Sequence, residues 1–471
     1  MIPGFMESLP SLFPELVLIA GAIILLMVGV SRQPDSRFAV RWGLVSSVIA
    51  LAAMAWSANP AVDSFAGIMA FDGLATAGRL LVLGSLIAAL LMSHPWLEKS
   101  GMLAAEYVSL LMLSASALMG VCASANWLAL VIFMETSAVA LAAIMGMRRS
   151  DTAGREAALK YFILSAFASA FLLFGAAVMF SQVHGFQVSA PAAWDPASIA
   201  GTLFILAGLA FKCSLVPFHA WAPDTNEGAP TPVAAFIASA SKVAGFTVLA
   251  RFLIAGGSGA FNGGGAVLEA LAVMSMLLGT VLALTQTSLR RLLAYSGISQ
   301  AGYLLLAFMG TGDTRLEAVI IYLAVYSAMT LGVFALVSVL EDEGRTPEVP
   351  SLAGLAVRHP VLAGSFTVAM VSLTGLPPTA GFFAKFLAFR EALSGGYLFA
   401  VLVAILASVV SAGIYIRLLA PAILDPAERS KVVPPVAPGA MFVAVGTAFF
   451  LLATGLFPSV LQSLAGLFLT R

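Results

Sequence analysis

Charged residues are scarce in this 471-residue sequence: 10% of residues are Asp, Glu, Lys or Arg, whereas 61% are hydrophobic. The 23 basic residues balance the 23 acidic ones, and no block of one sign occurs, which argues against nucleic acid as a partner. A mean hydropathy of +1.02 lies far outside the range of water-soluble globular domains. The composition therefore predicts an integral membrane protein.

Residues that bind metals and redox groups are also rare. The two cysteines, Cys122 and Cys213, lie in separate apolar runs, and the four histidines are scattered, so no spacing typical of a metal site occurs. The glycine-rich stretch at 256–265 lacks the third glycine of the dinucleotide-binding pattern and is interpreted as a loop. We therefore expect no metal and no redox cofactor in this chain.

Long apolar runs are abundant. A helix needs about 20 apolar residues to cross the hydrocarbon core, and charges and Pro/Gly clusters delimit about fourteen such runs. They cover approximately residues 12–31, 43–60, 74–93, 102–122, 127–147, 157–180, 197–218, 231–250, 266–286, 292–310, 316–340, 360–389, 397–416 and 437–458. The runs are too long for the alternating strands of a barrel. The sequence predicts an all-α polytopic membrane protein with about fourteen transmembrane helices.

The basic residues predict the orientation of these helices. Lys and Arg accumulate in short cytoplasmic loops. When the N-terminus is placed outside, most of the 23 basic residues fall in loops on the inner side. We therefore expect a multi-pass protein of the bacterial inner membrane, with both termini on the periplasmic side.

Four charged residues lie well inside the expected spans. Glu135, Lys212 and Lys242, in the fifth, seventh and eighth runs, are expected at similar depth near the bilayer midplane, and Lys385 lies in the twelfth run. A charge at this depth costs about 3 kcal/mol or more, so we expect these groups to face the bundle interior. Lysine suits proton exchange because it can lose its charge on burial, whereas arginine cannot. The hypothesis is a proton relay, and the alternative is a structural ion-pair network that only fixes helix packing.

Three further charges in or near the spans have simpler explanations. Lys160 is one turn into its run and four residues after Glu156, so a local ion pair or snorkelling competes with a role in proton transfer. His219 is either a member of the relay or a histidine that only satisfies backbone groups. Arg79 lies one turn from the outer end of its run, and we expect it to have no role in proton transfer.

Prolines interrupt two of the apolar runs: Pro217 in the seventh, and Pro377 and Pro378 in the twelfth. Proline removes a backbone donor, and the freed carbonyl is tolerated in a membrane only where protein or water satisfies it. We therefore expect helices 7 and 12 to be discontinuous. Paired breaks five helices apart, an odd number, indicate two inverted five-helix repeats. The expected units are three N-terminal helices (1–100), the first repeat (101–260), the second, inverted repeat (261–420), and a loop with a last helix (421–471).

Polar residues continue along the second expected repeat. Tyr295, Gln300 and Tyr326 could extend a relay from Lys242 towards Lys385. The alternative is that they only bond neighbouring helices to each other, which is the commoner use of single polar residues in membrane helices.

Five motifs resemble those of the antiporter-like membrane subunits of respiratory NADH-quinone oxidoreductase, complex I. The motifs are "ALKYFILSAFAS", "FKCSLVPFHAWAPDTNEGAPTPV", "ASKVAGF", "QTSLRRLLAYSGISQAGYLL" and "GLPPTAGFFAKF". The likeness runs from about residue 100 to residue 420. The "EGAPTPV" ending, the length and a lysine in the twelfth run favour the N type of subunit over the L and M types.

The resemblance implies roles for individual residues. Glu135 would pair with Lys212, Lys242 would be the central lysine, and Lys385 would lie near the exit of a proton path. Many relatives have histidine where this chain has Gln300, and glutamine cannot titrate.

The resemblance also implies cofactors and partners. NADH, FMN, iron–sulfur clusters and quinone would bind to other subunits, and the partners would be subunits such as M and K and the lipid bilayer. The expected function is proton translocation driven by quinone reduction elsewhere in the complex. The alternative is a subunit of an Mrp-type cation/proton antiporter or of a membrane-bound hydrogenase.

Overall fold

The computed structural model describes residues 8–32, 34–56, 65–183, 185–189, 194–255, 264–312, 314–341, 347–426 and 436–469. Within these ranges the chain is helical, and the only extended pairings are isolated bridges between loop residues. The loop expected at 256–265 lies almost entirely outside the described residues. The all-α prediction is confirmed for the part of the chain described.

In the described part of the chain, eleven helices are long and apolar enough to cross a membrane, and each coincides with one of the expected runs. They are α2 (Phe13–Arg32, preceded by the 3₁₀ turn η1, Leu9–Leu12), α3 (Ser36–Trp56), α4 (Gly73–Ser100), α5 (Ala104–Ala123), α6 (Trp127–Gly146), α7 (Thr152–Val183), α10 with η2 and α11 (Thr231–Phe236, Ile237–Ser241 and Lys242–Ala255), α12 (Gly264–Leu284), α14 (Arg315–Leu340), α18 (Leu398–Leu424) and α19 (Pro438–Leu456).

The other expected spans coincide with shorter or more polar helices. These are α8 (Pro196–Lys212), α13 (Leu289–Leu306), and the consecutive helices α16 (Pro360–Thr374) and α17 (Ala380–Ser394). Short helices complete the described chain: α9 (Trp221–Gly228), η3 (Val349–Leu352), α15 (Leu355–Arg358) and α20 (Pro458–Leu469).

The segment around Pro217 separates two helices. Helix α8 ends at Lys212, before this proline and short of the end of the expected run at 218, and α9 begins at Trp221. The carbonyl of Phe211, in the last turn of α8, accepts the main-chain N–H of Ser214 at 2.9 Å and the indole N–H of Trp221 at 2.9 Å. Because the last carbonyls of a helix need outside partners, α9 helps to satisfy the end of α8.

The segment around Pro377 and Pro378 also separates two helices. α16 ends at Thr374, and Gly375 follows with φ of 84°, a left-handed conformation that glycine adopts at little cost. Helix α17 then begins at Ala380. The Val216–Pro217 and Pro377–Pro378 bonds are both cis.

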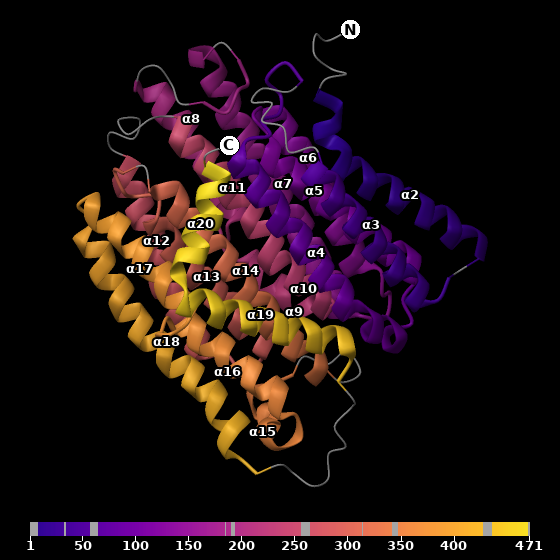
Figure 1. Ribbon diagram of the computed structural model, residues 1–471. Coiled ribbons are helices and arrows are strands. Elements are labelled where there is room, and N and C mark those ends of the chain that lie inside the picture. Colours follow the sequence, from indigo (N-terminus) through magenta and orange to yellow (C-terminus); the bar gives the residue numbers. More distant parts are fainter. Residues whose placement is uncertain are drawn as a thin grey trace.

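The helix formed by α10, η2 and α11 runs through the middle of the bundle. Figure 1 shows it between the N-terminal helices, coloured indigo and purple, and the orange helices α16 to α18. It packs against α4, α5, α8 and α14, and the span from Thr231 to Leu253 is buried throughout its most apolar window. Its central turn, η2, is π-helical, a rare conformation that is frequent at functional sites. Lys242 follows this turn directly.

Candidate functional site: a row of buried lysines

Three lysines are almost completely buried in the bundle. Lys212 is 1% exposed, and Lys242 and Lys385 are each 5% exposed. They lie at the end of α8, at the start of α11 and in α17, and we call them the lysine axis. Among the described residues, no carboxylate oxygen lies within 4.0 Å of any of these three ammonium groups.

Lys212 has the fewest contacts of the three. Its Nζ is buried without a hydrogen-bond partner in the described chain. Glu135, half-buried on α6, interacts with it electrostatically but accepts a hydrogen bond from the Ser169 hydroxyl of α7 instead. The expected pair of Glu135 and Lys212 is therefore a long-range one, and each group keeps its own surroundings.

Lys242 is held by neutral groups. Its ammonium donates to the carbonyl of Gly297 on α13 and lies 5.3 Å from the centre of the Tyr326 ring. The Tyr326 hydroxyl donates to the Ala238 carbonyl of the π-helical turn at 3.0 Å. A Cβ at position 297 would lie 2.8 Å from the Lys242 ammonium, so the glycine leaves the room that the lysine needs to reach this carbonyl.

Gly245 brings the first two lysines together. It lies one turn after Lys242, and a Cβ there would stand 3.2 Å from Cγ of Lys212 and 3.0 Å from Sγ of Cys213. Helix α11 thus approaches the end of α8 without an intervening side chain. The Lys212 and Lys242 side chains both interact electrostatically with Cys213, the residue that follows Lys212.

Gln300 lies between Lys242 and Lys385. It is one turn after Gly297 on α13, and its Nε2 donates to the Leu373 carbonyl at 3.1 Å. Its Oε1 accepts the Tyr322 hydroxyl at 2.7 Å. Both ends of the amide are therefore engaged, and the side chain connects α13 to the end of α16.

Lys385 donates to the carbonyl with which α16 ends. Its ammonium lies 3.0 Å from the Thr374 carbonyl and 3.1 Å from the Ser408 hydroxyl of α18. It also lies 4.4 Å from the centre of the Tyr303 ring. Ser408 itself donates to the Thr374 carbonyl at 3.1 Å. A backbone acceptor freed at the break is thus satisfied by the lysine and the serine.

Other predicted residues lie off this row. Pro217, Pro377 and Pro378 are exposed on the surface of the chain. His219 is partly exposed, and its Nδ1 has no hydrogen-bond partner in the described chain. Tyr295 is half-buried, and within the described ranges its side chain makes no hydrogen bond to the lysines.

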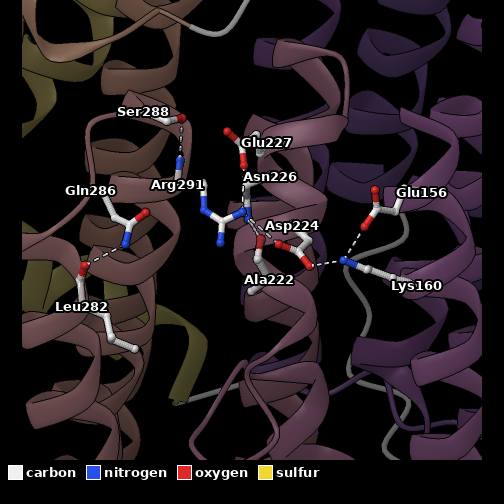
Figure 2. Close-up of polar contacts among 10 residues, drawn as sticks. All are labelled: Glu156, Lys160, Ala222, Asp224, Asn226, Glu227, Leu282, Gln286, Ser288 and Arg291. Carbon is white, nitrogen blue, oxygen red and sulfur yellow. Dashed lines mark hydrogen bonds and ion pairs between the residues drawn. The ribbon is translucent and has the colours of Figure 1, made fainter. Parts of the chain in front are cut away.

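A second group of charges joins α7, α9 and α13, and Figure 2 shows it in close-up. Lys160 bridges Glu156 at 2.6 Å and Asp224 at 2.7 Å. Arg291 bridges the same Asp224 at 3.0 Å and Glu227 at 2.8 Å. We call these five residues the end network. The local pair of Lys160 with Glu156 is the one expected from their spacing.

The buried arginines are paired with carboxylates. Arg79 donates to both carboxylate oxygens of Glu15 at 2.7 Å and to the Ser11 carbonyl at 2.8 Å. It is 3% exposed, so this ion pair lies in the interior of the bundle. Arg290, also 3% exposed, lies 4.0 Å from Glu341.

Several contacts on the lysine axis were missed at the level of sequence. Gly297 and Tyr303 lie one helical turn before and after Gln300. Their spacing places them on the same face of the helix as Gln300 and could have indicated that they lie near the lysines. The carbonyl of Thr374 carries no signal, because every residue has a carbonyl. Ser408 resembles any other serine in an apolar helix.

Metal-binding side chains do not gather in the described ranges. No cluster of three or more His, Cys, Asp or Glu side chains able to hold a metal occurs there. Cys122 and Cys213 are both buried and form no disulfide.

Comparison with known sequences shows extensive similarity. Residues 124–411 match the family described as NADH:quinone oxidoreductase/Mrp antiporter, transmembrane. NADH-quinone oxidoreductase subunit N of Desulfovibrio desulfuricans is 38% identical over 435 residues, which are 87% of this chain and 86% of the relative. The subunit N of Methylobacterium nodulans is 34% identical over 474 residues, 98% of this chain and 97% of the relative.

Comparison with solved structures gives the same fold. A chain of respiratory complex I from Thermus thermophilus superimposes with a TM-score of 0.83 at 32% identity, covering 96% of this chain and 99% of that one. A chain of the Mrp complex from Dietzia superimposes with a TM-score of 0.82 at 20% identity, covering 98% and 97%. The second likeness shows a shared fold alone.

Proposed function

The chain belongs to the NADH:quinone oxidoreductase/Mrp antiporter family of transmembrane proteins, and from this membership we propose that it is a proton-translocating membrane subunit of an NADH-quinone oxidoreductase. One observation carries the proposal: the lysine axis, three buried ammonium groups linked through α13, none of which has a carboxylate of the described residues within 4.0 Å. A lysine held by neutral dipoles can release its proton without leaving an unpaired carboxylate behind.

Glu135 and Lys212 supply the coupling step of the proposed mechanism. Glu135 is half-buried, so a neighbouring subunit can change its surroundings, and it interacts with Lys212 over a distance longer than an ion pair. Any change in the charge or position of Glu135 alters the stability of the Lys212 ammonium. Because Lys212 and Lys242 both interact electrostatically with Cys213, the change is passed on electrostatically to Lys242.

Transfer from Lys242 to Lys385 follows α13 in the proposed mechanism. Gly297 holds the first lysine, and Gln300 contacts Leu373, next to the carbonyl that holds the second. Glutamine cannot carry the proton itself. Gln300 therefore holds the groups along the path in place and does not titrate. Work against about 200 mV requires about 4.6 kcal/mol per proton, which quinone reduction elsewhere would supply.

The finer organisation of the fold is part of the proposal. The ends of α8 and α16 at proline-containing segments fit two discontinuous membrane helices, and their offset fits inverted repeats over 101–260 and 261–420. Helices before 101 and after 420 would flank the repeats. The termini would both be periplasmic, as the distribution of basic residues favours.

Cofactors and partners follow from the same proposal. NADH, FMN, the iron–sulfur clusters and quinone would be bound by other subunits of the complex. Membrane subunits of the M and K types would cover parts of the apolar surface, and lipid the rest. The Mrp-type alternative shares the family description, but its solved structure is only 20% identical to this chain, whereas relatives 34–38% identical are NADH-quinone oxidoreductase subunits.

Lys212→Ala in the assembled complex tests the proposal. Quinone reduction and proton uptake are measured together in inverted membrane vesicles, and we expect both rates to fall relative to wild type. Lys99→Ala, which removes an exposed lysine at the end of α4, is the matched control and should leave both rates unchanged. Wild-type rates in Lys212→Ala would show that this lysine is not part of the path.

A further inference from the structure

An apolar cleft of about 490 Å³ lies on the side of the bundle, between α4, α14, α19 and α20. Figure 1 shows α19 and α20, in yellow, crossing next to α4 and α14. Of the 23 residues that line the cleft, only Ser85, Ser327 and Thr447 are polar. The lining along α4 extends from Ala77 to Leu91, about 21 Å of a hydrocarbon core that is about 30 Å thick.

Close glycine contacts lie at both ends of the stretch of α4 that lines the cleft. Gly73 packs against the main chain of Phe468 on α20, and Gly439 on α19 packs against the main chain of Leu91. Neither glycine leaves room for a Cβ. The surrounding helices therefore touch at the two ends and separate between them.

The middle of the cleft is open. Gly84 on α4 and Gly446 on α19 both line it, and a Cβ at either position would meet nothing within 4 Å. Two large side chains at its rim are well exposed, Phe442 at 70% and Leu464 at 45%. The cleft is therefore accessible from the hydrocarbon region of the membrane.

The size of the cleft decides what can occupy it. A helix about 10 Å across takes up about 120 Å³ per residue, so the cleft would hold only about one turn of a partner's helix. If a methylene group takes the roughly 30 Å³ share of a water molecule, there is room for about 16 methylene groups. We propose that the cleft binds one acyl chain of a membrane phospholipid.

The hydroxyl groups in the lining support a purely apolar ligand. Ser85 and Thr447 donate to carbonyls of their own helices. Ser327 is 4% exposed, and its hydroxyl is without a hydrogen-bond partner in the described chain. The single hydroxyl of Ser327, near the middle of α14, lies far from the ester groups of a phospholipid. The acyl chain is therefore held through its methylene groups.

The cleft lies directly behind the surroundings of Lys242. The Ser85 hydroxyl shares a hydrogen bond of 2.8 Å with the hydroxyl of Ser239, in the π-helical turn that precedes Lys242. Tyr326, whose ring contacts the Lys242 ammonium, is the neighbour of Ser327. A bound acyl chain supports this wall and keeps water from reaching Lys242 from the side. This consequence, unlike the binding itself, rests on the proposed function.

Leucine at the two open glycines tests the binding. The whole complex is placed in phosphatidylethanolamine vesicles that contain a phospholipid with a photoactivatable acyl chain, and labelled peptides are identified by mass spectrometry. Wild type should be labelled on α4, α14 and α19. In Gly84→Leu with Gly446→Leu the added side chains fill the cleft, and labelling should fall at least about tenfold because several methylene contacts are lost.

A matched variant and a second probe separate the outcomes. Gly413→Leu places the same side chain at an exposed glycine of α18 outside the cleft, and labelling should equal that of wild type. Equal labelling of the double variant and wild type would overturn the proposal. The proposal would also be overturned if a photoactivatable quinone labelled the same peptides in wild type but not in Ser327→Ala. The ligand would then be a molecule with a polar ring.

Proton uptake in the double variant is the last readout. Reduced uptake at normal assembly supports the role of the acyl chain beside Lys242. Unchanged uptake with lost labelling would leave the binding site in place and overturn that role. The labelling does not depend on proton transfer, so failure of the proposed function would not be confused with failure of this inference.

Discussion

The lysine axis and the end network contain the same kind of charge in opposite surroundings. In the end network, Lys160 has a side chain that is 42% exposed and two carboxylates within 2.7 Å. On the lysine axis, Lys242 and Lys385 are 5% exposed and contact carbonyls, a hydroxyl and ring faces. Where water is near, the cations are paired; where water is excluded, the lysines are not.

The buried arginines show that burial alone does not explain this difference. Arg79 and Arg290 are as buried as the lysines, yet each has a carboxylate close by, Glu15 and Glu341. Arginine stays charged in a protein interior and so needs a counter-charge, whereas lysine can exist neutral. The absence of carboxylates beside the lysine axis therefore separates groups that hold a charge from groups that can exchange one.

Removing the counter-charge of a buried arginine should have the largest effect. Glu15→Gln leaves the Arg79 guanidinium buried without an anion, which should lower the free energy of unfolding by about 3–5 kcal/mol. Thermal unfolding of the purified complex in detergent, and the amount of subunit in membranes, measure this loss. Glu98→Gln, at a side chain 50% exposed, is the control. Equal stability of the two variants would mean that the interior pair contributes nothing.

A permanent charge on the lysine axis should have the next largest effect. Lys242→Arg keeps a cation next to Gly297 and Tyr326 but removes the ability to release a proton. Coupled proton uptake should fall by roughly 100-fold, the lower end of what a positioned acid–base group contributes. Simultaneous assays of quinone reduction and proton uptake measure the change. If Lys242→Arg pumps normally, proton release by this lysine is not required.

Removing a paired and partly exposed lysine should have the smallest effect. Lys160→Met leaves Asp224 paired with Arg291 at 3.0 Å, so stability should change by about 0–1 kcal/mol. Proton uptake should stay close to that of wild type in the same vesicle assay. A loss as large as that in Lys242→Arg would place Lys160 on the proton path and erase the contrast between the two groups.

The sequence predicted the buried lysines because a charge in a long apolar run must face the interior. Its prolines mark the segments that follow the ends of α8 and α16, because proline cannot continue the backbone hydrogen bonding. It could not predict that α9 resumes a helix after Pro217, since that depends on the end of α8 needing partners. The pair of Arg79 and Glu15 was also out of reach, because nothing in one sequence shows which helices touch.

The acceptors of Lys242 and Lys385 are main-chain carbonyls, at Gly297 and Thr374. Side-chain substitution cannot delete a main-chain carbonyl. Mutational scanning of a proton path therefore tests the donors of these hydrogen bonds but not their acceptors. Carbonyl groups absorb infrared light at a frequency that depends on what they accept. A carbon-13 label in the main chain at either position would therefore act as a local reporter of whether its lysine is charged during turnover.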